Sequence, residues 1–194
     1  HLSIRRQRQM CIRDSVDGEF IASYCLDNKA ALAIMLDLLG RGLEPAVDTY
    51  LIASAKEEVG AIGALYFSQN QRLDALVALE IAPIAPEYPI VAGSQPVLLA
   101  QDGYGLYDDA LNAALSEAGE QIGLAVQWGA IAGFGSDASI VMKFGHVPRA
   151  ACLGFPTDNT HGYEIAHLGG VIACADLLAA WLVGDPLAGC SIAF

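Results

Sequence analysis

Basic residues are scarce in this sequence. Only 10 Lys and Arg stand against 22 Asp and Glu in 194 residues, which gives a formal net charge of −12. Nucleic-acid binding depends on clustered Lys and Arg, so this balance argues against a nucleic-acid partner. Long apolar runs are missing too: residues 168–183 are interrupted by Gly169, Gly170 and Asp176. A membrane helix needs 18 or more apolar residues, so we expect no membrane partner.

Paired cysteines are also absent. The five cysteines never form a C-x-x-C pair; they are Cys11, Cys25, Cys152, Cys174 and Cys190. This pattern excludes a zinc knuckle and gives no disulfide framework. Isolated thiols are typical of a reducing compartment, and the N-terminus lacks the apolar segment of a secretory signal. The sequence therefore predicts a cytoplasmic protein.

The first fifteen residues differ in composition from the rest. Residues 1–15 hold four of the ten basic residues and one of the 22 acidic residues. We expect this leader to be non-native sequence, or disordered, and to pack poorly against the domain. A natural basic arm is the alternative. Residues 16–194 then form one domain, because a chain of this length can bury one core.

Strand-like and helix-like segments alternate along residues 16–194. This order predicts a layered α/β domain, helix/sheet/helix, with a mostly parallel central sheet. The helices are expected at 30–39 and 107–122, followed by a long terminal helix opened by residues 160–164. The strands are expected at 47–54, 73–81, 96–100, 125–129 and 148–156.

Acidic residues and one histidine follow the predicted strands. Ligand sites in open α/β sheets lie at the carboxyl ends of the strands, where residues distant in sequence meet. Each residue also has a plainer interpretation: a helix cap, a solvated turn, or an acid that has reached solvent. Taken together, we expect them to converge; they are Asp27, Glu57, Glu58, Glu80 and His161. Carboxylates with an imidazole suit zinc, cobalt or manganese, and a carboxylate that does not ligate could take a proton from metal-bound water.

Four motifs in this order resemble the glutamyl aminopeptidase/endoglucanase-named family of dinuclear zinc aminopeptidases, which includes the tetrahedral aminopeptidases. They are Asp27-Asn28-Lys29, Lys56-Glu57-Glu58-Val59-Gly60-Ala61-Ile62-Gly63-Ala64, Gly135-Ser136-Asp137-Ala138 and Thr160-His161-Gly162-Tyr163-Glu164. The resemblance covers about residues 16–183. It implies a metal-dependent aminopeptidase that hydrolyses N-terminal residues from peptides and forms homo-oligomers.

The resemblance also implies residue roles. Asp27 would bridge two metal ions and Glu57 would be the general base. Glu58 and His161 would ligate the second ion. Glu80 would ligate the first ion, where the family usually has an Asp.

The sequence departs from this family in what precedes Asp27. The family has a further His ligand for the first ion and an inserted β-rich domain upstream, and neither is found here. The chain thus resembles the C-terminal catalytic portion of a longer enzyme, truncated at the N-terminus. The intact enzyme would hold two divalent ions, whereas this chain should hold one well.

Two other functions stay open at this point. One is a related dinuclear zinc carboxypeptidase or deacylase, although that group usually begins its bridging motif with Asp-Asp rather than Asp27-Asn28. The other is a metal-binding fragment without turnover, which the missing His would allow.

Overall fold

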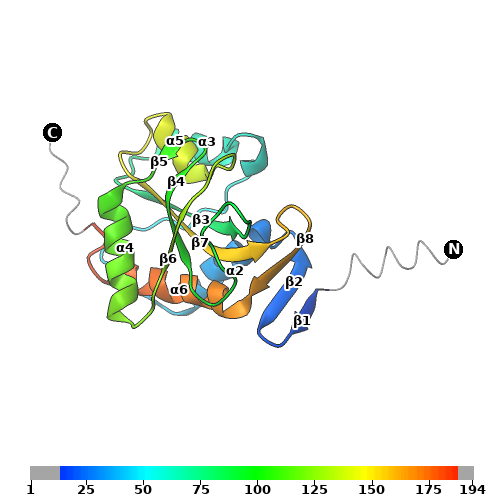
Figure 1. Ribbon diagram of the computed structural model, residues 1–194. Helices are drawn as coiled ribbons and strands as arrows, with labels where there is room; N and C mark the ends of the chain where they lie inside the picture. Colours follow the sequence, from blue (N-terminus) through cyan, green and yellow to red (C-terminus); the bar gives the residue numbers. More distant parts are fainter. Residues whose placement is uncertain (1–13, 188–194) are drawn as a thin grey trace.

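The computed structural model describes residues 14–187, which form three layers with a mixed sheet in the middle (Figure 1). The strands are β1 (Ser15–Asp17), β2 (Phe20–Tyr24), β3 (Leu76–Pro83), β4 (Val97–Asp102), β5 (Gly105–Leu106), β6 (Gln127–Ala130), β7 (Ala150–Asp158) and β8 (Tyr163–His167). The helices are α2 (Leu26–Gly40), the short 3-10 helix η1 (Glu57–Val59), α3 (Ile62–Asn70), α4 (Asp109–Gln121), α5 (Asp137–Lys143) and α6 (Leu168–Val183).

Strand β7 organises the sheet. It pairs in parallel with β3 along its length, and antiparallel with β4 and β8. Strand β8 continues antiparallel to β2 and then β1, whereas β4 continues parallel to β6. The layered α/β architecture is as the sequence predicts, but the sheet is mixed rather than mostly parallel. The hairpin β1–β2 and strand β8 account for much of the antiparallel pairing.

Alternating side chains on β7 divide the core into two faces. Ala151, Leu153 and Phe155 pack with α2, α4 and α6, whereas Cys152 faces the side of α5. Figure 1 shows the same division, with α3 and α5 on one side of the sheet and α2, α4 and α6 on the other. Every residue from Ala150 to Thr157 is buried, as expected of a strand covered by helices on both faces.

The strand predicted at residues 47–54 is not formed. These residues form no regular secondary structure and pair with no strand in the part of the chain that the structure describes. A cavity of about 860 Å³ is lined by both residues 47–54 and residues 73–80, which include the start of β3. The alternation in the sequence indicates strand propensity, but a strand also needs a hydrogen-bonding partner. Residues 47–54 have none, so they end as a loop leading to η1.

The segment around His161 also differs from the prediction. Residues 160–164 were expected to open the terminal helix, but Tyr163–His167 form β8 and the helix begins at Leu168. The ring of His167 caps this helix, because its Nδ1 accepts a hydrogen bond from the backbone N–H of Gly169 at 2.9 Å. His161 therefore lies in a tight turn between two strands.

The predicted boundary after residue 15 falls inside the folded domain. Ser15 pairs with Ala22 in the β1–β2 hairpin, and Asp14 accepts a short hydrogen bond from the hydroxyl of Ser23. The prediction for residues 1–13 lies outside the described residues. No helix within residues 14–187 is long and apolar enough to cross a membrane.

Candidate metal centre

Asp27 leaves the regular helix geometry at the start of α2. Asp27 and Asn28 have non-helical backbone angles, and no side chain caps this helix end. The plainer interpretation of Asp27 as a cap is therefore wrong. Its carboxylate is free to face the hollow at the ends of the strands, and its backbone N–H donates to Oε2 of Glu164 at 3.0 Å.

Glu57 and Glu58 lie in η1, a single tight turn. The backbone N–H groups of Gly60 and Ala61 both donate to the carbonyl of Glu57 at 2.9 Å. Gly63 allows the following helix to start beneath this turn, since a Cβ there would meet backbone atoms of Ala55 at 2.6 Å. Gly63 is thus needed because the backbone of Ala55 passes too close for any side chain. The turn thus brings two neighbouring carboxylates to the same cavity.

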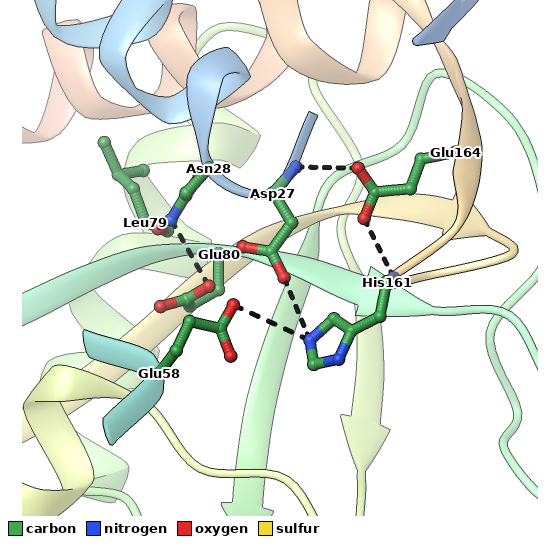
Figure 2. A network of polar contacts seen from close by, with 7 residues as sticks. All are labelled: Asp27, Asn28, Glu58, Leu79, Glu80, His161 and Glu164. Atoms are coloured by element: carbon green, nitrogen blue, oxygen red, sulfur yellow. Dashed lines mark hydrogen bonds and ion pairs between the residues drawn. The ribbon is translucent and has the colours of Figure 1, made fainter. Parts of the chain in front are cut away.

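His161 brings an imidazole to Asp27 and Glu58. Its Nε2 lies 3.6 Å from Oδ2 of Asp27 and 3.7 Å from Oε1 of Glu58. One ligand atom from each of the three residues lies within 4.8 Å of the other two. Figure 2 shows the two carboxylates and the ring turned toward one another. His161 has a positive φ of 59° in its turn, a backbone conformation that is uncommon outside glycine.

Glu80 enters the same hollow from β3. The side-chain amide of Asn28 donates to Oε2 of Glu80 at 3.3 Å and to the carbonyl of Leu79 at 2.7 Å (Figure 2). All five residues singled out in the sequence line one cavity of about 210 Å³. Glu80 and Glu57 lie outside the group of three that shares the 4.8 Å spacing. The structure brings the five together, and their roles stay predictions.

The electrostatics of the hollow favour a cation. Burial, followed by repulsion from Glu58 and Glu164, raises the pKa of Asp27 to about 6. Burial and the nearby Asp137 and Glu58 raise the pKa of Glu57 to about 7. Burial, followed by repulsion from Asp27, also raises the pKa of Glu80 well above its ordinary value. Each shift reports that ionising these acids is costly without a compensating charge.

Glu164 also belongs to this site, although no role was assigned to it from the sequence. It is 1% exposed, and its two carboxylate oxygens accept the backbone N–H groups of Asp27 at 3.0 Å and His161 at 3.2 Å. It thus ties together the two segments that carry the imidazole and one carboxylate. The sequence shows Glu164 three residues after His161. A helix was expected there, however, and it gave no reason to expect the Glu164 side chain to face the interior.

Asp137, at the start of α5, is a further carboxylate close enough to Glu57 to affect its pKa. It accepts a short hydrogen bond from the hydroxyl of Ser54, and its second oxygen is buried without a hydrogen-bond partner among the described residues. Burial raises the pKa of the Asp137 carboxyl. This residue adds to the negative charge that surrounds Glu57.

The raised pKa values predict how the stability of the metal-free protein depends on pH. Asp27 and Glu57 are protonated in the folded protein at pH values where they are ionised in the unfolded chain. Their contribution to stability is therefore full near pH 4 and is lost as pH rises through about 6 to 7. We expect the unfolding midpoint measured in a chelator to fall across this window. The variant Glu57→Gln should show a shallower fall, and an equal or steeper fall would contradict the assignment.

The variant Glu164→Gln tests whether the hydrogen bonds from Asp27 and His161 to Glu164 support metal binding. Glutamine keeps the shape but replaces one acceptor by an NH₂ group that faces a backbone N–H. Loss of an outer hydrogen bond to a metal ligand typically weakens metal binding by about 10–100-fold, and we expect this loss in a zinc titration. Glu19→Gln is the matched control, because that side chain is 82% exposed and lies beside His167 instead. Unchanged zinc affinity in Glu164→Gln would show that the tie is structural only.

The donor set fits a divalent metal ion. Two carboxylates and one imidazole are ligands that zinc commonly takes, and three protein ligands are typical of catalytic zinc. No Lys or Arg is among the described residues that line the cavity. A cation would therefore offset charges that the protein leaves uncompensated.

Three comparisons extend these observations. A sequence profile of the M42 glutamyl aminopeptidase family matches residues 12–177. FrvX of Escherichia coli (strain K12), whose name assigns it provisionally to the aminopeptidases, is 27% identical over 165 residues, covering 80% of this chain and 44% of FrvX.

Solved structures share the fold. The aminopeptidase APDkam598 from the archaeon Desulfurococcus kamchatkensis superposes with a TM-score of 0.81 at 23% identity, over 94% of this chain and 57% of that one. The TET1 peptidase of Pyrococcus horikoshii, described as assembling into a tetrahedron or a large octahedral shell, gives a TM-score of 0.76 at 20% identity, over 89% and 53%. The chain thus spans about half the length of these relatives.

Proposed function

This chain belongs to the M42 glutamyl aminopeptidase family, and from that membership we propose that it carries the catalytic residues of a metal-dependent aminopeptidase. Its substrates would be peptides with a free N-terminal amine. The observation that carries the proposal is the meeting of Asp27, Glu58 and His161 within 4.8 Å, beside Glu57, in one cavity. Because the chain spans about half of its relatives, the activity of the whole protein is part of the proposal.

Asp27, Glu58 and His161 would hold one divalent ion, with zinc, cobalt or manganese as candidates. Asp27 and Glu80 would contribute to a second ion in the intact enzyme. Bound metal would supply Lewis-acid polarisation of the scissile carbonyl and a lower pKa for the attacking water. Asp27 can serve both positions because a carboxylate has two oxygens and about four lone-pair sites.

Glu57 would act as general base. It lies in the same turn as Glu58 but outside the group of three, so its carboxylate is left to handle protons. Burial and the neighbouring acids raise its pKa to about 7 in the metal-free protein, and a bound cation would favour the ionised carboxylate that accepts a proton. Glu57 would accept a proton from the attacking water and donate one to the leaving amine.

A binding role without turnover is supported by one observation. His161 is the sole histidine among the described residues that line the cavity. His146 lies elsewhere, with its Nδ1 3.0 Å from the hydroxyl of Ser68, and His167 caps α6. A second ion would then have only carboxylates from this chain, and turnover would be slight.

A peptidase assay with a blocked substrate tests the proposal. We expect the purified chain with zinc, cobalt or manganese to release the N-terminal residue of a short peptide slowly, because the second ion would be bound weakly, and to leave the same peptide intact when its amine is acetylated. Release from the carboxyl end, or removal of the acetyl group, would favour a carboxypeptidase or deacylase instead. Stoichiometric metal binding without any cleavage would favour the binding role.

Assembly and location extend the proposal. The TET1 peptidase of Pyrococcus horikoshii is described as forming large closed assemblies, and we expect a homo-oligomer for the intact enzyme. Size-exclusion chromatography with light scattering tests this directly. We also propose a cytoplasmic location, which fits the free thiols of Cys25, Cys152 and Cys174, and cell fractionation would check it.

A further inference from the structure

The cavity that contains the acidic cluster has a second set of walls, and these are apolar. Leu99 on β4, Ile131 after β6 and Ile140 on α5 line it, and each is less than a tenth exposed. Phe134 and Tyr104 are more open and also line it. These side chains play no part in the proposed metal site. They offer a surface for an apolar group placed next to that site.

One further carboxylate lines this part of the cavity, and the protein already occupies it. Oδ1 of Asp102 accepts the backbone N–H of Tyr104 at 2.8 Å, and Oδ2 accepts the hydroxyl of Tyr107 at 2.6 Å. The Tyr107 hydroxyl also lies 2.8 Å from Oγ of Ser136, which caps α5. Asp102 is 5% exposed, so this network fixes the wall and adds negative charge there.

The described walls contain no cationic side chain. Among the described residues that line the cavity, none is Lys or Arg. Lys143 is close to one wall, but its ammonium lies over the Tyr104 ring, 4.7 Å from the centroid, and Lys143 is not a lining residue. Gly135 holds that ring close, since a Cβ there would meet Cε2 of Tyr104 at 2.1 Å. The Lys143 ammonium is thus placed on the Tyr104 ring rather than among the cavity walls.

We propose that these apolar walls receive the side chain of the substrate's N-terminal residue, and that they select neutral apolar side chains over acidic ones. This rests on the proposed aminopeptidase function and adds the substrate class. An N-terminal Glu would bring a carboxylate into a hollow that holds Asp102 and no cationic partner, and an unpaired buried charge is strongly disfavoured. The family is described as glutamyl, and this chain's pocket argues against a glutamyl preference.

The size of the cavity bounds the side chain. The whole cavity has a volume of about 210 Å³. Part of that room borders the metal site. The room left for a side chain is therefore smaller than the whole cavity.

Binding of amino-acid amides to the zinc-loaded chain tests this proposal without relying on turnover. Norleucinamide, glutamic acid α-amide and lysinamide have similar lengths and differ in charge. We expect calorimetry to show norleucinamide binding at least about tenfold more tightly than the glutamic acid amide. Lysinamide should bind no more tightly than norleucinamide, because the Asp102 oxygens already accept hydrogen bonds.

A charge placed in the wall should change the order. Phe134→Arg puts a cation at the half-buried rim, and we expect it to narrow the preference for norleucinamide over the glutamic acid amide by about tenfold or more. Tyr66→Arg is the matched control: it adds the same charge on α3, where the side chain is 73% exposed and outside the cavity. This control should leave the preference unchanged.

Three results would overturn the proposal: equal or tighter binding of the glutamic acid amide, tenfold tighter binding of lysinamide, or no binding of any amide. Peptide cleavage measured on the same preparations separates the two proposals. Cleavage with a preference for N-terminal Glu would reject the apolar pocket and keep the aminopeptidase. Amides bound in the expected order without peptide cleavage would reject the aminopeptidase activity of this chain and keep the pocket.

Discussion

In the intact enzyme, replacing Glu57 by glutamine should lower the rate of peptide hydrolysis by about 10²–10⁴-fold, the usual contribution of general-base assistance. Metal content should stay nearly unchanged, because Glu57 lies outside the three residues whose ligand atoms share a 4.8 Å spacing. Glutamine keeps the size and polarity of the side chain but cannot accept the proton. The rate with the zinc-loaded enzyme, and zinc per chain by elemental analysis, are the two measurements.

Glu58→Gln is the matched control for this experiment. Glu58 is the adjacent residue in η1, and its Oε1 lies 3.7 Å from Nε2 of His161. We expect this variant to lose zinc, and its activity with it. Loss of zinc in Glu57→Gln and retention in Glu58→Gln would mean that the two roles are reversed.

Metal titration of the purified chain should show one divalent ion bound tightly and a second bound weakly. The tight site has Asp27, Glu58 and His161, whereas the weak site has Glu80 and a share of Asp27 without an imidazole. Binding should release protons near pH 6, because the pKa of Asp27 is raised to about 6 in the metal-free protein and ligands bind deprotonated. The unfolding midpoint should rise with metal concentration.

Removal of His161 gives the sharper form of this prediction. His161→Ala should weaken the tight site by more than the 10–100-fold that loss of an outer hydrogen bond to a ligand costs. His146→Ala is the control, because that ring lies against Ser68 on α3 and outside the cavity. Two tight sites in the unmodified chain, or none, would show that the ligand sets are misassigned.

The sequence predicted the inner strands well and the segments at their margins poorly. The strands expected at 73–81 and 148–156 appear as β3 and β7, because continuous apolar residues there match burial on both faces. The segment 47–54 has an equally clear alternation but no partner strand among the described residues. Local pattern reports propensity, and pairing depends on residues elsewhere in the chain.

The sequence suggested acids and a histidine that the structure brings to one cavity, but it did not suggest the residue that holds two of them in position. Asp27, Glu58 and His161 could be found because each follows a predicted strand, although the one before Glu58 does not form, and because carboxylates with imidazole suggest a metal. Glu164 was missed because its role depends on the β8 strand that turns it inward, toward two backbone N–H groups. Such a role is fixed by tertiary geometry, which residue type and spacing do not report.

Within residues 14–187, β3 has a strand partner on one edge only, and the other edge has a consequence for how this chain should behave in concentrated solution. Strand β3 pairs with β7 on one side, while residues 73–80 line a cavity of about 860 Å³. An open strand edge is a template for aggregation, because its free N–H and C=O groups can recruit extended segments of other molecules. Aggregation monitored by light scattering should therefore accelerate with protein concentration, and a proline at the outward-facing N–H groups of β3 should slow it. If the proline variant aggregated as fast as the unmodified chain, the surface responsible for aggregation would lie elsewhere in the fold.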